Sequence, residues 1–239
     1  MYRKLPKAIN TWKYNKVTEV VIIIELAEIF YSLQGEGPSS GKPSIFIRLS
    51  KCNLSCVGCD TIIKDKVEEV TDVSLNKRIE SHMNGHPNAR IVITGGEPFL
   101  QPDAIKSILD RWPKSPVDVE TNGTLELPDE VLKRLSIIVV CPKRNTFPTV
   151  KERVAFFKKW CALDNVYLKI VVGPVNWMWS ESEIRDVIKL SGVPLHKIFV
   201  MPGGGTVHEL EVSGKNCWKV AARLGVNYSD RLHLRCAAR

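Results

Sequence analysis

Three cysteines fall within a single short segment, KCNLSCVGCD. Cys52, Cys56 and Cys59 have the spacing C-x3-C-x2-C, and soft thiolates bind iron–sulfur clusters or zinc in preference to hard cations. Three thiolates can hold three irons of a [4Fe–4S] cubane and leave the fourth iron open to a small chelating ligand. A structural zinc site needs a fourth ligand, and the nearest histidine, His82, is twenty-three residues beyond Cys59. The spacing therefore favours an iron–sulfur cluster.

The remaining four of the seven cysteines are dispersed along the chain. An odd number of cysteines with three of them clustered is more typical of a metal site than of a disulfide framework. We interpret the other four as buried or incidental thiols. They are Cys141, Cys161, Cys217 and Cys236.

Glycines and polar residues follow several apolar segments in the motifs TGGEP, ETNG, CPK and MPGGG. Paired glycines let a backbone approach a ligand closely, and a carboxylate can accept hydrogen bonds from an ammonium group. The plain alternative is a set of ordinary strand-to-helix turns. The candidate cofactor-binding residues in these motifs are Gly95, Gly96, Glu97, Glu120, Asn122, Cys141, Lys143 and Pro202.

Short apolar segments alternate with segments of helical periodicity, and these elements must position the motifs. Strands without polar alternation, separated by helices, indicate a parallel sheet covered on both faces. Successive βα units predict an α/β fold, a partial (incomplete) parallel β/α barrel, in which the motifs share the C-terminal edge of the strands. We expect strands at 20–30, 44–49, 90–93, 117–120, 137–140, 167–172 and 198–201, and helices at 75–83, 102–112, 128–135, 156–160, 182–190 and 216–224.

The composition is that of a globular protein with a formal net charge of +8. The basic residues are scattered, which favours a solvated surface over a nucleic-acid interface. No apolar run approaches the length that spans a bilayer, so we expect a cytoplasmic protein without a membrane partner. Residues 1–18 are read as a basic N-terminal extension and residues 19–239 as one partial-barrel domain.

The cysteine spacing together with TGGEP resembles the radical S-adenosylmethionine (SAM) superfamily. The resemblance implies that the cofactor's methionine amino and carboxylate groups chelate the fourth iron. The reduced cluster then splits the cofactor to give a 5′-deoxyadenosyl radical. It also implies that TGGEP binds the methionine amino group. We expect ETNG to reach the ribose or carboxylate and CPK to contact polar groups of the cofactor. For Pro202 of MPGGG, only its position in the fold argues for a contact with the adenine.

Within that superfamily, EIFYSLQGEGPSSGKPSIFIRLSKCNLSCVGCDT resembles the opening of the 7-carboxy-7-deazaguanine synthase family. The similarity continues through TGGEP, ETNG and CPK to Arg231-Leu232-His233. It implies a carbon–nitrogen lyase that converts 6-carboxy-5,6,7,8-tetrahydropterin to 7-carboxy-7-deazaguanine with loss of ammonia, in queuosine- or archaeosine-type biosynthesis. A homodimer and an electron donor such as flavodoxin are also implied.

The resemblance assigns roles to residues that would otherwise be read as turn and surface positions. Gln34 and Glu36 match the loop that reads the guanine-like edge of the pterin, where an acceptor carboxylate suits N–H donors. Arg48 matches an arginine that contacts the substrate, and its fork suits a carboxylate. Thr61 matches the threonine that ligates Mg2+, an ion that prefers oxygen ligands, and Asp60 is the second choice on charge grounds.

The chain departs from the family pattern at three places. Cys141 replaces a serine, IIKDK follows Thr61 where an aromatic-containing segment is usual, and the tail RLHLRCAAR lacks the usual aromatic ending.

Two alternatives remain open at this stage. A glycyl-radical-enzyme activase would use the same cluster and cofactor, but it needs neither the QGEG loop nor the CDT threonine. A zinc-binding, basic nucleic-acid module would bind with strong salt dependence.

Overall fold

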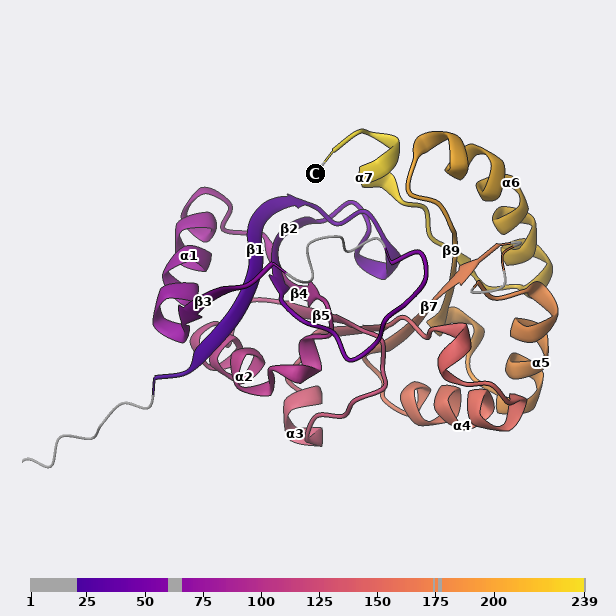
Figure 1. Cartoon of the computed structure of the whole chain (residues 1–239), viewed down its shortest axis with the longest axis horizontal. Helices are drawn as coiled ribbons and strands as arrows, with labels where there is room; N and C mark the ends of the chain where they lie inside the picture. Colours follow the sequence, from indigo (N-terminus) through magenta and orange to yellow (C-terminus); the bar gives the residue numbers. More distant parts are fainter. Residues whose placement is uncertain (1–20, 60–65, 174, 176–177, 239) are drawn as a thin grey trace, which may run out of the picture.

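The computed structural model describes residues 21–59, 66–173, 175 and 178–238. Within these residues nine strands form one sheet in the order β3-β1-β2-β4-β5-β6-β7-β8-β9 (Figure 1). The strands are β1 (Ile23–Leu33), β2 (Pro43–Leu49), β3 (Glu68–Thr71), β4 (Arg90–Gly95), β5 (Val117–Thr121), β6 (Ile137–Val140), β7 (Val166–Val172), β8 (Ile198–Pro202) and β9 (Asn227–Tyr228).

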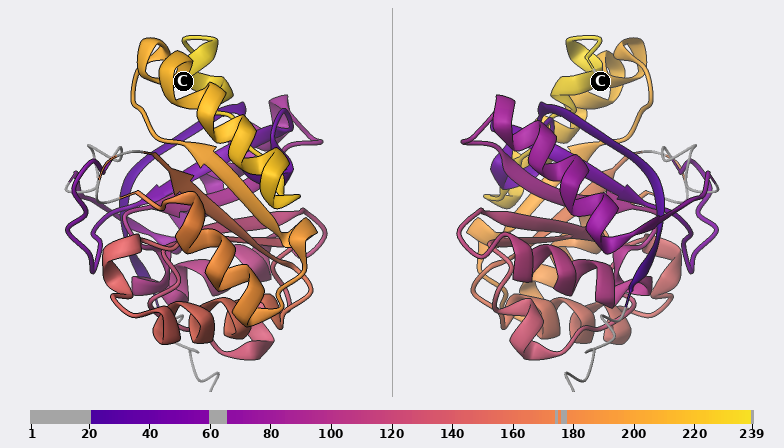
Figure 2. Two further views of the ribbon diagram at one scale, coloured as in Figure 1. Left: turned by 90° about the vertical axis from the view of Figure 1, so that its right-hand side faces the viewer. Right: turned by 90° about the vertical axis from the view of Figure 1, so that its left-hand side faces the viewer.

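The helices follow the strands and run as an arc around the sheet (Figures 1 and 2). Three of the longer ones, α4, α5 and α6, begin with capping boxes, in which a Thr or Ser side chain and a Glu three residues later satisfy the first free N–H groups. The helices are α1 (Asp72–Gly85), α2 (Pro102–Arg111), α3 (Asp129–Leu132), α4 (Val150–Cys161), α5 (Glu181–Ser191), α6 (Val207–Leu224) and α7 (Leu232–Arg235).

The sheet is parallel from β2 through β9 and antiparallel at β1, which pairs with both β2 and β3. The segment 34–42 that joins β1 to β2 is too short for a parallel crossover, which needs a dozen or more residues. Strands β3 and β9 lie at opposite ends of the strand order, so the barrel is open. The predicted α/β class and partial barrel are confirmed.

The two faces of the sheet differ in character. Every second strand residue points to the helical side, where Ile47, Ile93 and Ile170 are examples. These side chains pack in the main core with the buried apolar side chains of α1, α2, α4, α5 and α6. The other face carries a small separate cluster that includes Phe30 and Phe46. Helices therefore cover one face of the sheet. The second face is concave and carries polar residues, and the segment 34–42 and the C-terminal segment lie over it.

Several boundaries differ from the sequence-based prediction. Helix α6 begins nine residues earlier than expected, at Val207, and α3 is shorter than predicted. The short strands β3 and β9 and the helix α7 were not anticipated, because elements of two to four residues have little periodicity to detect. The extension 1–18 lies outside the described residues. In the part of the chain that is described, no helix is both long and apolar enough to cross a membrane.

Candidate functional site

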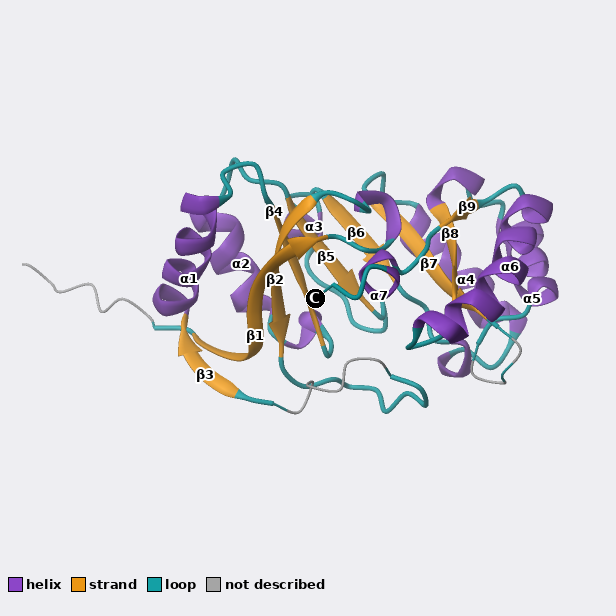
Figure 3. Ribbon diagram, turned by 90° about the horizontal axis from the view of Figure 1, so that it is seen from above, coloured by secondary structure: helices purple, strands orange, loops and turns teal. Residues whose placement is uncertain are grey.

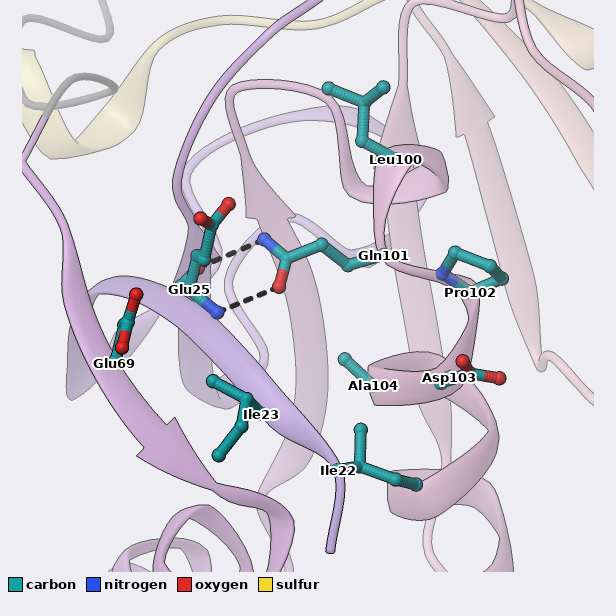
Figure 4. Close-up of a pocket in the computed structure, with 9 residues that line it drawn as sticks. All are labelled: Ile22, Ile23, Glu25, Glu69, Leu100, Gln101, Pro102, Asp103 and Ala104. Carbon is teal, nitrogen blue, oxygen red and sulfur yellow. Dashed lines mark hydrogen bonds between the residues drawn. The ribbon is translucent and has the colours of Figure 1, made fainter.

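The cysteine loop begins directly after β2, and contacts at its base hold its two ends together. The Ser50 hydroxyl donates to the Lys66 carbonyl oxygen at 2.5 Å, which ties the ends of the loop to each other. Gln101, just before α2, braces β1 beside it: its side chain accepts from the Glu25 N–H at 2.8 Å and donates to the Glu25 carbonyl oxygen at 2.9 Å (Figure 4). The Ser50 N–H in turn donates to the Glu25 carbonyl oxygen at 2.8 Å. These hydrogen bonds hold the first residues of the cysteine loop in place against β1.

The three thiols are accessible to different degrees: Cys52 and Cys56 are half-buried and Cys59 is exposed. The Cys52 sulfur faces two N–H donors, the Leu54 backbone at 3.4 Å and the Asn122 amide at 3.9 Å. Among the described residues, no three His, Cys, Asp or Glu side chains lie close enough together to hold a metal ion. Three cysteine thiols are the donor set that a [4Fe–4S] cluster needs. In this structure the three side chains lie along the loop and do not meet at one point.

The paired glycines of TGGEP pack against the start of the cysteine loop. The N–H groups of Gly96 and Glu97 donate to the carbonyl oxygens of Leu49 and Lys51 at 3.0 and 2.8 Å. A Cβ at Gly95 would lie 2.1 Å from the Leu49 carbonyl oxygen, and a Cβ at Gly96 would lie 1.8 Å from that of Lys51. Gly95 also has a φ of 129°, which other residues rarely adopt. The glycines therefore allow a close approach to the chain's own backbone.

Glu97 joins TGGEP to ETNG. Its fully buried carboxylate accepts hydrogen bonds from the Phe99 N–H at 3.0 Å, the Thr121 hydroxyl at 2.7 Å and the Asn122 N–H at 2.7 Å. Burial raises the pKa of Glu97, and these three hydrogen bonds oppose the rise. In this structure the Glu97 carboxylate therefore joins two turns at the C-terminal edge of the strands, which we call the rim: TGGEP and ETNG.

Asn122 connects the same rim to the cysteine loop. Besides facing the Cys52 sulfur, its amide donates to the Asn53 side chain at 3.0 Å, and the Asn53 amide donates to the Thr124 hydroxyl at 2.8 Å. The cysteine loop, TGGEP and ETNG are thus one hydrogen-bonded unit at the C-terminal edge of the strands.

Glu120 points away from that unit, onto the concave face. One of its carboxylate oxygens accepts from the Gln34 amide at 2.9 Å and the other from the Lys169 ammonium at 3.2 Å. Lys169 also donates to Glu36 at 2.5 Å. The structure therefore groups Glu120, predicted to bind the cofactor, with the predicted substrate-binding residues Gln34 and Glu36.

Glu36 is the centre of this concave-face cluster. Arg231 binds its carboxylate from the C-terminal segment at 3.0 Å, and the His233 ring nitrogen lies 3.9 Å away. Burial alone would raise the pKa of Glu36, but Lys169 and Arg231 lower it to about 2. Glu36 is therefore ionised across the whole physiological pH range.

Arg48 lies on the same face but has other partners. Its guanidinium pairs with Glu28 of β1 at 2.9 Å and lies 5.6 Å from the centre of the Phe30 ring. Strand register places Arg48 on the same face as the cluster. Arg48 is level with Thr94, and the same level on the next strands falls at Glu120, Val139 and Tyr167. Lys169 lies two residues beyond Tyr167 on β7 and therefore faces the same side. Side chains at equivalent register positions of parallel strands project from the same face.

The remaining predicted cofactor residues lie at the ends of β6 and β8. Cys141 is half-buried, its N–H donates to the Thr121 carbonyl oxygen at 2.7 Å, and burial raises the pKa of its thiol. Lys143 is half-buried at the following turn, where the Pro142 carbonyl oxygen accepts from the Trp179 indole at 3.0 Å. Pro202 is buried and ends β8. Thr61 and Asp60, the predicted magnesium ligands, lie outside the described residues.

Two residues of the concave-face cluster were not among the predicted site residues: Lys169 and Arg231. Lys169 is the only charged residue in the strand VYLKIVV and is 4% exposed. A single lysine inside an apolar strand was the signal that could have identified it, because lysine is rarely buried unless it is paired.

Known proteins match this chain in sequence and in fold. Residues 33–124 match the family model described as a 4Fe-4S single cluster domain. A 7-carboxy-7-deazaguanine synthase of Hyperthermus butylicus is 30% identical over 92% of this chain and 95% of its own length. One of Methanospirillum hungatei is 38% identical over 78% and 75% of the two chains. The crystal structure of QueE from Escherichia coli matches with a TM-score of 0.57 and 25% identity, covering 87% of this chain and 93% of that one.

A partial β/α barrel with a cysteine loop at the C-terminal edge of its strands defines a radical SAM enzyme. The extent of the match to the curated relatives then decides the family. This chain belongs to the 7-carboxy-7-deazaguanine synthase family.

Proposed function

We propose that this protein converts 6-carboxy-5,6,7,8-tetrahydropterin to 7-carboxy-7-deazaguanine with loss of ammonia, in 7-deazapurine biosynthesis. The observation that carries the proposal is the match to relatives of that name along nearly the whole chain, including 95% of the Hyperthermus butylicus protein. The concave-face cluster supports it, because Gln34 and Glu36 lie there with their polar groups organised for binding.

The proposed cofactors are a [4Fe–4S] cluster on Cys52, Cys56 and Cys59 and SAM beside it. When bound, this pair supplies the radical that abstracts hydrogen from the substrate. Gly95, Gly96, Glu97 and Asn122 are proposed to line the cofactor side of the rim, with Cys141, Lys143 and Pro202 at its far end. The residues of the chain itself bind and orient the cofactor and the substrate and enclose them.

The proposed substrate contacts divide by charge. Glu36 is ionised and acts only as a hydrogen-bond acceptor, which suits the N–H donors of the aminopyrimidinone edge. Arg48 is proposed to bind the substrate carboxylate, for which its planar fork is well matched. That role requires Arg48 to share or exchange its present partner, Glu28.

Magnesium is part of the proposal, with Thr61 as the protein ligand and Asp60 as the second choice. We expect T61A to weaken the magnesium dependence of turnover while iron content and deoxyadenosine formation persist. An unchanged magnesium response would move the assignment away from Thr61. A homodimer and a flavodoxin-type electron donor complete the proposal on the family resemblance alone. A cytoplasmic location is proposed from the sequence, in which no apolar run approaches the length that spans a bilayer.

The deciding experiment is anaerobic turnover of 6-carboxy-5,6,7,8-tetrahydropterin with SAM, reductant and Mg2+. We expect release of ammonia and formation of 7-carboxy-7-deazaguanine. The alternative, a glycyl-radical-enzyme activase, is not favoured by the family membership, and it predicts deoxyadenosine formation without any change in the pterin. A colourless protein containing zinc would contradict both.

A further inference from the structure

Lys169 forms a buried ionic bridge in the concave-face cluster. Its ammonium group contacts the Glu36 carboxylate at 2.5 Å and the Glu120 carboxylate at 3.2 Å, and its side chain is 4% exposed. The bridge joins β7, β5 and the segment 34–42, which are far apart in the sequence. Lys169 therefore donates hydrogen bonds to both carboxylates.

We propose that Lys169 is a positioning residue of the substrate site: it holds Glu36 and Glu120 together as a pair of acceptors for an uncharged edge of N–H donors. This inference rests on the proposed function, since that edge is the aminopyrimidinone of the pterin. It assigns a role to a residue that neither the motifs nor the family resemblance singled out.

The first step in the argument is electrostatic. Two carboxylates that share a buried site repel each other, and burial of an unpaired charge is costly. Lys169 lies between them, and Arg231 binds Glu36 from the other side at 3.0 Å. Two anions and two cations leave the cluster without net charge when His233 is neutral. A ligand therefore need not be cationic to be accepted here.

The second step concerns hydrogen-bonding capacity. Each carboxylate oxygen can accept about two hydrogen bonds, and an ionised carboxylate offers no donor. Each carboxylate is oriented by its cation, and its oxygens can accept more hydrogen bonds than those from Gln34, Lys169 and Arg231. A neutral edge with adjacent N–H groups matches that arrangement, whereas removal of the ammonium would favour a protonated carboxyl or a cationic ligand.

The electrostatic surroundings of Lys169 agree with this role. Burial alone would lower the pKa of Lys169, but the Cys141 thiol, Glu120 and Glu36 together raise it well above its ordinary value. The ammonium therefore stays charged, as the bridge requires.

The test compares K169M and K169R with K197M in the reconstituted holoenzyme, using 6-carboxy-5,6,7,8-tetrahydropterin from pH 5 to 9. Lys197 is the matched control, since it is also a buried lysine but donates to the carbonyl oxygens of Cys161 and Leu163. In K169M we expect kcat/KM to fall about 100-fold through misplaced carboxylates. The acid limb of its pH profile should move up by about one pH unit or more, as Glu36 loses a neighbouring cation.

K169R should keep the parent acid limb and recover part of the lost kcat/KM. K197M should lower thermal stability without moving the acid limb. A K169M enzyme with the parent's KM and acid limb would overturn the proposal. If K169M does not fold, K169R decides: an unchanged KM contradicts a positioning role, and a raised KM with an unchanged acid limb supports it.

A measurement without substrate separates this inference from the proposed function. Infrared titration of the holoenzyme gives the carboxylate signal of Glu36 as the difference between parent and E36Q, and between K169M and K169M/E36Q. We expect that signal to titrate at higher pH in the K169M pair. If the parent does not turn over the pterin but this shift is seen, the proposed function fails while the bridging role of Lys169 survives. An unshifted signal overturns the bridging role.

Discussion

Five of the seven thiols of this protein fall into two kinds of environment. Cys52, Cys56 and Cys59 lie on a loop and are half-buried or exposed. Cys161 and Cys217 are buried in the core, and burial raises the pKa of their thiols to about 11 and about 12. Because the thiolate is the metal-binding form, the buried pair is poorly suited to ligate iron.

Replacement of any one of the three loop cysteines by Ala is expected to abolish SAM cleavage and to lower the iron content, because a second iron then lacks a protein ligand. C217A is the matched control and should keep its iron, although it leaves a small cavity in the core. Iron analysis and a deoxyadenosine assay measure both effects. Full cleavage activity in C52A, C56A or C59A would contradict the ligand assignment.

Arg48 and Glu36 carry the prediction that is specific to the pterin. Removal of either polar contact leaves a substrate group unpaired, so R48A and E36Q should each lose about 2–5 kcal/mol in kcat/KM. R48K should recover only part, since an ammonium cannot reproduce the bidentate fork. Iron content should stay at the parent level in all three.

R111A is the control for the arginine variants. Arg111 forms an exposed ion pair with Glu80 on the outer helices, and such pairs contribute little. Near-normal kcat/KM in both R48A and E36Q would remove the pterin hypothesis and leave the radical SAM assignment in place.

At the scale of elements, the site consists of turns that are packed on one another. TGGEP is hydrogen-bonded to the residues that lead into the cysteine loop, and Glu97 ties it to ETNG. The segment 34–42 crosses to the other end of the sheet. There the Gly37 N–H donates to the Ser229 hydroxyl at 2.8 Å and the Leu232 N–H donates to the Gly35 carbonyl oxygen at 3.1 Å. Figure 3 shows α7 lying near this segment.

The close packing of TGGEP predicts that G96A is strongly disruptive. Its Cβ would lie 1.8 Å from the Lys51 carbonyl oxygen, so the turn and the cysteine loop must separate. We expect a loss of about 1–3 kcal/mol in unfolding free energy and a lower iron content. Thermal unfolding and iron analysis measure these effects.

Gly85 at the end of α1 provides the comparison. A Cβ there meets no atom within 4 Å, so G85A should be neutral or stabilise by about 0.4–1 kcal/mol. Equal stability of G96A and G85A would show that the two backbones do not pack as described.

At the scale of the whole molecule, buried and half-buried ion pairs connect elements that are distant in sequence. Glu183 at the start of α5 binds Arg144 at 2.9 Å and Arg153 of α4 at 2.7 Å. Burial alone would raise the pKa of Glu183, but hydrogen bonds from Ser180, Arg153 and Arg144 lower it to about 2. These contacts fix the turn that carries Lys143 against the helical layer.

This depressed pKa makes a prediction about acid stability. The Glu183 carboxyl is harder to protonate in the folded chain than in the unfolded chain, where its ordinary pKa is 4.5. Its stabilising contribution is therefore present above pH 4.5 and is lost as the pH falls toward 2. E183Q should be less stable than the parent by about 1–3 kcal/mol at neutral pH, and the difference should shrink as the pH falls through that window.

Chemical unfolding at a series of pH values measures the effect. E211Q, which replaces an exposed carboxylate on α6, should follow the parent at every pH. A stability difference between E183Q and the parent that does not depend on pH would mean that Glu183 is not preferentially ionised in the folded state.

The sequence by itself determined the cluster loop, the α/β class and the rim turns. Each of these depends on local spacing or on the end of one apolar segment, as in the C-x3-C-x2-C pattern and the strand before Gly95. Parallel strands end at a common edge, so their turns could be placed together without knowing the packing. Strand 137–140 was predicted with its observed bounds for the same reason.

Only the tertiary structure decided which polar side chains meet on the concave face. Glu36 and Arg231 are 195 positions apart, and Glu36 and Lys169 are 133 positions apart, so no local pattern links them. Strands buried on both faces have no polar alternation, and periodicity therefore could not tell that Glu120 faces the concave side rather than the cofactor rim. That assignment required the register of β2, β4, β5, β6 and β7 together, because register sets which face each side chain occupies.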